Sequence, residues 1–299
     1  MKIKIIAMAF VVAFTISTAS ADTMPAFNSS LTLAPADAGS AGGGAATDDK
    51  AQQEADLAKK LQNPVAALIS VPIQNNWDFG IGPAHAMKYT ANIQPVIPIG
   101  ISDDWNLILR TIVPVIYQEA LVNNPKAPNG LGQSHSGLGN VTQTFFFSPK
   151  EPVGGWIIGA GPVGYYPTAT ESILGPGEWG AGPSIVVLQQ KNGFTYGALA
   201  NHIWSFAGWD NQEVNATFLQ PFLSYTTKTY TTFGVNTETT YNWVTQEATA
   251  PMNFTIQQLV KIGKMPVAFQ FGYRYYVEKP DGGPDWGLRF TITFLFPKK

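Results

Sequence analysis

Cysteine is absent from the 299 residues, and only three histidines occur: His85, His135 and His202. This excludes disulfides, thiol catalysis and cysteine-ligated zinc or iron–sulfur sites, and it leaves little for a histidine-rich metal site. Charged residues make up 13%, about half the usual share of a soluble domain. The net charge of −2, with no basic block, also argues against nucleic-acid binding. No run after the first residues reaches 18 apolar residues, so no transmembrane helix is predicted.

The N-terminus has the pattern of a secretory signal peptide. Lys2 and Lys4 precede the apolar run 5–14, and Ala19-Ser20-Ala21 forms a small-x-small cleavage site. We therefore predict that residues 1–21 direct export and are removed, so that the mature chain starts at Asp22. Because no cysteine follows the cleavage site, the lipoprotein route is excluded.

A period-two pattern runs through most of residues 63–299. Residues 287–296 (GLRFTITFLF) place apolar side chains at every second position, and 230–243 and 267–275 alternate in the same way. Such alternation indicates half-buried strands. About twelve strands are predicted, near 65–79, 87–99, 105–117, 137–147, 154–166, 178–189, 194–206, 214–226, 230–243, 248–260, 266–277 and 285–296.

The character of the two strand faces favours a membrane barrel over a soluble sandwich. One face is apolar and aromatic, and the other carries Thr, Asn, Gln and Gly with few charges. Tryptophans fall near predicted strand ends, and short and long connections mostly alternate. A transmembrane barrel requires an apolar outside, aromatic girdles and a polar inside. The sequence thus predicts an all-β, transmembrane antiparallel up-and-down β-barrel of about 12 strands, embedded in a lipid bilayer.

Residues 22–62 differ from the barrel, which we place at 63–299. Residues 34–47 are rich in Ala and Gly and read as a flexible linker, whereas 48–61 (DDKAQQEADLAKKL) contain strong helix formers. Two placements of this short helix are open. It lies at the edge of the barrel, or it enters and blocks the lumen.

Ionisable side chains on the inward parity are the candidate functional residues. They are Asp78, Lys88, Arg110, Glu238, Arg274 and Arg289, which include all three arginines of the chain. Charges on the lipid face cost a few kcal/mol near mid-membrane, so these residues are expected to line the lumen. Two roles are open: a structural network, in which the arginines pair with carboxylates such as Asp78 and Glu238, or solute selectivity.

Two patterns that could indicate cofactor binding or catalysis lack the structural context that these functions require. The glycine pattern at 159–164 matches a dinucleotide fingerprint, but no helix follows it. A barrel phospholipase would place His and Ser two positions apart on one strand; here Ser205 lies three positions after His202 and faces the other way. We therefore predict no catalytic, cofactor-binding or metal site, no cofactor, and no enzyme.

Seven stretches together resemble the family of outer-membrane channels associated with meta-pathway phenol degradation. They are NPVAALISVP (63–72), NIQPVIP (92–98), FFFSP (145–149), WGAGP (179–183), YGALANHIWS (196–205), FLQPF (218–222) and PDGGP (280–284). In addition, 287–296 resembles the signal recognised by the outer-membrane assembly machinery, although Pro297-Lys298-Lys299 follow the final Phe.

The resemblance implies a monomeric channel or transporter in the bacterial outer membrane. It would pass or bind small solutes, aromatic or hydrophobic ones included, without energy input. A structural or surface-interaction barrel with a closed lumen is the alternative.

Overall fold

The computed structural model describes residues 44–209 and 212–297, and in this part of the chain nearly all regular structure is antiparallel β. The predicted signal peptide and most of the predicted linker lie outside the described residues. One α-helix, α1 (Gly44–Leu61), precedes the strands, and the 3-10 helix η1 (Pro128–Gly130) lies in a long connection. The strands are β1 (Ile69–Ile81), β2 (Ala86–Ile93), β3 (Val96–Gly100), β4 (Trp105–Gln118), β5 (His135–Leu138), β6 (Val141–Pro149), β7 (Ile157–Tyr166), β8 (Glu178–Lys191), β9 (Phe194–Gly208), β10 (Asn215–Thr226), β11 (Thr231–Thr237), β12 (Thr239–Asn242), β13 (Glu247–Ile262), β14 (Met265–Glu278) and β15 (Trp286–Phe296).

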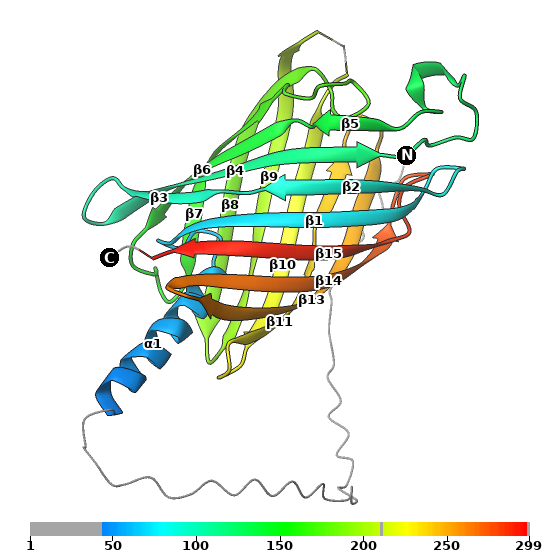
Figure 1. Ribbon diagram of the computed structural model, residues 1–299. Coiled ribbons are helices and arrows are strands. Elements are labelled where there is room, and N and C mark those ends of the chain that lie inside the picture. Colours follow the sequence, from blue (N-terminus) through cyan, green and yellow to red (C-terminus); the bar gives the residue numbers. More distant parts are fainter. Residues whose placement is uncertain (1–43, 210–211, 298–299) are drawn as a thin grey trace, which may run out of the picture. The chain divides into compact units, whose positions relative to one another are not determined.

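The strands form one closed barrel, which confirms the predicted fold class. β2 and β3, β5 and β6, and β11 and β12 are each one transmembrane strand with a short break, so the strand segments make a 12-strand antiparallel barrel. Each strand pairs with its neighbours in sequence, and β1 pairs with β15 to close the ring. Figure 1 shows the strands running side by side around the wall, with α1 at the end where β15 finishes.

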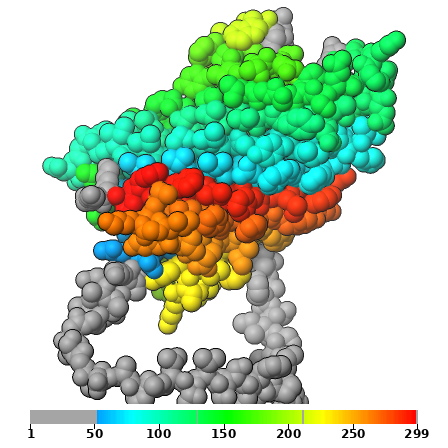
Figure 2. Space-filling model, in the orientation of Figure 1, coloured from blue at the N-terminus to red at the C-terminus, as the bar shows by residue number. Residues whose placement is uncertain are grey.

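The closing pair is regular along its whole length. Its register runs from Ile69 opposite Phe296 to Phe79 opposite Trp286. In the space-filling view the side chains of β15 lie directly against those of β1, with no gap between them on this face (Figure 2). The first and last strands are therefore paired along the whole of β15, as a barrel without water-exposed edges requires.

The connections define two ends of the barrel. The links 101–104, 150–156, 192–193, 227–230 and 263–264 lie at the end that we call the turn end, together with α1 and the end of β15. At the opposite end, called the loop end here, lie 82–85, 119–134, 167–177, the link after β9, 243–246 and 279–285. The loop end carries the longest connections. No helix in the described part of the chain is long and apolar enough to cross a membrane.

The outward face carries the apolar parity of the strands. Phe271 is 60% exposed and Phe233 is 51% exposed, whereas Gln270 and Thr291, on the other parity, border a cavity inside the barrel. Exposed tryptophans mark strand ends at Trp105, Trp156, Trp179, Trp204, Trp243 and Trp286. This outer surface has the apolar band and aromatic girdles of a membrane barrel.

The first strand starts later than predicted. β1 begins at Ile69, and not near residue 65, because the chain just before it turns into the barrel. Asn63 makes this turn: its side-chain Oδ1 accepts a hydrogen bond from the Val65 amide at 2.9 Å, and its carbonyl accepts one from Ala66 at 3.1 Å. Val65, Ala66 and Leu68 are buried. Residues 62–68 are called the plug segment below.

Candidate functional site

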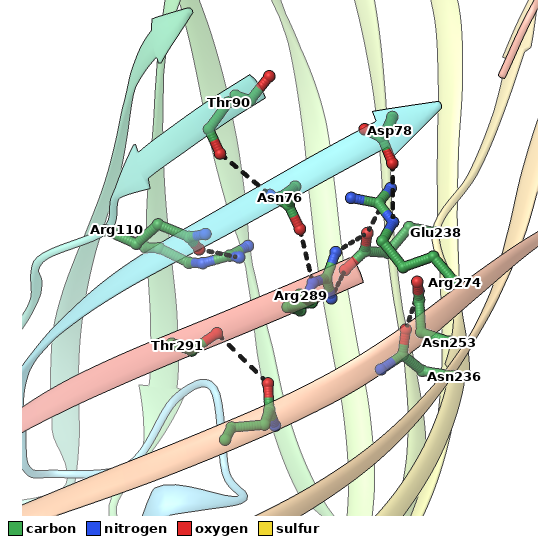
Figure 3. Close-up of polar contacts among 12 residues, drawn as sticks. Asn76, Asp78, Thr90, Arg110, Asn236, Glu238, Asn253, Arg274, Arg289 and Thr291 are labelled. Carbon is green, nitrogen blue, oxygen red and sulfur yellow. Dashed lines mark hydrogen bonds and ion pairs between the residues drawn. The ribbon is translucent and has the colours of Figure 1, made fainter. Parts of the chain in front are cut away.

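Four charged side chains meet inside the barrel and form an ionic cluster. Arg289 on β15 donates two parallel hydrogen bonds to Glu238, which lies between β11 and β12, at 2.8 and 2.7 Å. Arg274 on β14 lies between two carboxylates, with Nη2 3.8 Å from Glu238 Oε2 and Nε 3.5 Å from Asp78 Oδ1. Arg289 Nε also donates to Asn76 Oδ1 at 2.7 Å. Figure 3 shows these side chains converging in the lumen from β1, β14 and β15.

Two glycines make room for this cluster. In the strand register Arg274 lies opposite Gly287, and Arg289 lies opposite Gly272. A Cβ atom at Gly287 would fall 2.5 Å from Asp78 Oδ1, so any larger residue would push the carboxylate away from Arg274. The glycines thus allow two arginines to share one layer of a narrow barrel.

Two further cations have no carboxylate within 4 Å among the described residues. Arg110 on β4 donates to the neutral amide of Gln94 at 3.0 Å (Figure 3). Lys88 on β2 lies opposite Asp78 in register, but the ion pair of Asp78 is with Arg274. Lys88 and Arg110 therefore contribute positive charge to the lumen that no ion pair neutralises.

Two cavities follow one another along the lumen. The loop-end cavity has a volume of about 380 Å³ and is bordered by the ionic cluster, Lys88 and Tyr276. The turn-end cavity, of about 190 Å³, is bordered by Arg110, Gln270 and the plug segment. Gln74 borders both cavities. Arg289 borders the first cavity and Arg110 borders the second.

The plug segment closes the turn end of the lumen with apolar contacts. Val65 packs in a buried cluster with Ile108, Phe146, Val186, Leu188 and Leu199, each 2% exposed or less. Ala66 and Leu68 pack with Ala58 of α1 and with Leu295 of β15. The Lys59 carbonyl, near the end of α1, accepts a hydrogen bond from Gln190 at 2.8 Å. Between the two predicted placements of the helix, α1 therefore sits at the barrel end, while the segment after it enters the lumen.

The inner wall is not polar throughout, which corrects the prediction of a small or polar inner face. The side chains around Val65 form an apolar wall on β4, β6, β8 and β9. The turn-end cavity is bordered instead by Gln257, Gln270, Thr291 and Thr293 on β13, β14 and β15. The turn-end half of the lumen thus has one apolar side and one polar side.

A histidine holds two connections together at the loop end. His135 Nδ1 lies 2.5 Å from Glu171 Oε2, and its Nε2 lies 2.9 Å from the Gly130 carbonyl oxygen. Both partners, a carbonyl and a carboxylate, accept hydrogen bonds, and this arrangement favours a ring that is protonated on both nitrogens. The Gly130 carbonyl, followed by the Glu171 carboxylate, raises the pKa of His135 above its ordinary value. This contact ties 119–134 to 167–177.

The six predicted lumen residues separate into two groups. Asp78, Glu238, Arg274 and Arg289 come together in the ionic cluster, whereas Lys88 and Arg110 stand apart from it. Sequence reasoning missed Asn76, Gln94 and Val65. The two polar residues share the inward parity of their charged neighbours, so parity could have found them; Val65 carried no such signal. Among the described residues, no group of three or more His, Asp or Glu side chains is placed to hold a metal ion.

No family model and no curated protein matches the sequence. Solved structures do resemble the fold. An outer-membrane channel from Pseudomonas putida F1 aligns with a TM-score of 0.58 at 13% identity, over 77% of this chain and 96% of that one. Outer-membrane phospholipase A from Escherichia coli aligns with a TM-score of 0.45 at 9% identity, over 76% of this chain and 90% of that one. The likeness to the channel shows that this chain shares its β-barrel fold.

The prediction that the chain is not an enzyme is contradicted. Among the structures that align along three quarters of the chain are outer-membrane phospholipases, from Escherichia coli and from Salmonella typhi. The barrel fold is thus shared by channels and enzymes, and it does not decide between the two classes.

Proposed function

We propose that this protein is an outer-membrane channel for the passive passage of small solutes. The observation that carries the proposal is the lumen itself: two cavities in series, both bordered by polar side chains, inside a closed barrel. A barrel that only served as a structural support would have no need for polar space along its axis, because buried polar groups cost free energy unless they are paired.

Aromatic and hydrophobic compounds are the solutes that we propose. The resemblance to channels associated with meta-pathway phenol degradation supports this class. The apolar side chains of Leu68 and Val96, which border the turn-end cavity, support it too, because they offer contacts to an aromatic ring. We further propose that the chain is exported by its signal peptide, inserted through its C-terminal strand and active as a monomer.

Single-channel recording in planar bilayers tests the channel proposal. The mature chain should show small currents, and a variant lacking residues 22–62 should show larger ones, because α1 anchors the plug segment through Ala58. If neither protein conducted, although both had folded as judged by heat-modifiable migration on gels, the channel proposal would be wrong.

A closed barrel with a surface role is the second candidate. The observation in its favour is that the plug segment and the ionic cluster both obstruct the lumen. The same recordings separate the two candidates, since a surface barrel remains silent after the 22–62 segment is removed.

A further inference from the structure

The charges that line the lumen do not balance. Apart from Lys60 of α1, which is paired with Asp56, four cationic side chains border the two cavities, Lys88, Arg110, Arg274 and Arg289, and they face two carboxylates, Asp78 and Glu238. Both carboxylates lie in ion pairs with Arg274 or Arg289. The excess of positive charge is therefore concentrated on Lys88 and Arg110.

Lys88 places its charge beside the loop-end cavity. Its neighbours there include the neutral Thr90, Asn92 and Gln118 and, opposite it in the strand register, Asp78, whose ion pair is with Arg274. The side chain has no hydrogen bond or ion pair within reach among the residues that the structure describes. An ammonium group in this position, next to space for a small molecule, attracts an anion that enters from the loop end.

Arg110 likewise places a positive charge beside the turn-end cavity. No carboxylate borders this cavity within the described chain; the other cation there, Lys60, is paired with Asp56 at 2.7 Å. One N–H group of Arg110 donates to Gln94, and the other N–H groups of its planar guanidinium are available to a ligand. Guanidinium groups bind carboxylates through two parallel hydrogen bonds, as Arg289 does with Glu238.

We infer that Lys88 and Arg110 are two successive binding positions for a small carboxylate-bearing solute. The ionic cluster, which borders the same cavity as Lys88, limits passage, and the apolar side chains of Leu68 and Val96, which border the turn-end cavity with Arg110, suit the ring of an aromatic acid. This inference deepens the proposed function and rests on it, because it names the chemical class of the solute. It requires the lumen to prefer anions over cations.

Calorimetric titration of the detergent-solubilised mature chain with sodium benzoate tests the binding positions directly. Benzyl alcohol, an aromatic solute without the carboxylate, is the comparison ligand. We expect benzoate to bind more tightly than the alcohol, and Lys88→Met and Arg110→Met each to weaken benzoate binding about tenfold or more. The matched control is Lys264→Met, which removes an exposed charge in the turn between β13 and β14. Lys88→Arg should retain most of the benzoate binding. This result would show that the loss in Lys88→Met comes from the missing charge and not from misfolding.

Reversal potentials in a potassium chloride gradient give the second measurement. In the wild-type channel the reversal potential should lie closer to the equilibrium potential of chloride than to that of potassium. In the double variant Lys88→Met with Arg110→Met it should move toward the equilibrium potential of potassium. Benzoate binding that is absent, or that is equal in wild type and both variants, overturns the inference. A channel that conducts without chloride preference also overturns it, while the channel proposal stands. Binding without any conductance would preserve the carboxylate site and refute the channel.

Discussion

Glu238 is the carboxylate that lies close to both arginines of the ionic cluster, so its negative charge is the one that the lumen needs most. It accepts two hydrogen bonds from Arg289 and lies 3.8 Å from Arg274. Replacing it by Gln keeps the shape but turns one acceptor into an amide donor that faces guanidinium donors. The change leaves four lumen cations against Asp78 alone.

The expected loss of stability follows from burial. The side chain of Arg289 is 3% exposed and that of Glu238 is 19% exposed. Two unit charges about 4 Å apart attract each other by about 4 kcal/mol at an effective dielectric constant of about 20. Removing one partner of a buried pair costs about 3–5 kcal/mol. Because Arg289 keeps its bond to Asn76, we expect Glu238→Gln to lower the free energy of unfolding by about 3–5 kcal/mol and not by more.

Equilibrium unfolding in guanidinium chloride, followed by tryptophan emission in lipid vesicles, measures this loss. Glu151→Gln, which changes an exposed carboxylate in a turn, should stay within about 0.5 kcal/mol of wild type. The double variant Glu238→Gln with Arg289→Gln should lose about 0.5–3 kcal/mol less than the sum of the two single losses, because residues in contact couple by that amount. A loss below about 1 kcal/mol for the single variant would refute the view that Glu238 compensates a buried charge.

Three further predictions address the outer wall, the plug segment and the loops. Phe271→Arg should lower the free energy of unfolding by about 2–4 kcal/mol or block assembly, whereas Gln270→Arg should have a smaller effect; equal effects would mean that the two parities are reversed. Val65→Asp should loosen the plug segment and raise single-channel current, and the exposed neighbour Ala67→Asp should not; equal currents would show that the apolar contacts of Val65 do not hold the plug. Because the pKa of His135 is raised, its contact stabilises the loops at low pH and is lost as the pH rises through that pKa. Hydrogen exchange of 119–134 should therefore speed up with pH, beyond its intrinsic pH dependence, in the wild type but not in His135→Gln.

The barrel was predictable from the sequence because its signal is repeated many times. Each strand alternates only weakly, but β15 alternates without interruption, and membrane burial imposes the same rule on every strand. The inward parity likewise identified the charged residues, since a charge such as that of Arg274 is expensive on the lipid side.

What alternation could not predict is which inward residues meet across the lumen. Glu238 and Arg289 are 51 positions apart in sequence, and their contact depends on the barrel's diameter and stagger. The plug segment was misassigned for a related reason. Val65 begins an apolar run that suits a strand equally well, and only its long-range packing against Phe146 and Leu188 draws it inside.

The seam between β1 and β15 has a consequence for how the molecule is assembled. The plug segment leads directly into Ile69, the residue that pairs with Phe296 at the end of the last strand. The chain therefore passes from inside the wall to the wall itself at the position where the ring is sealed. Because Leu68 is bonded directly to Ile69, we expect the closing of this seam during assembly to bring the plug segment to the turn end of the lumen.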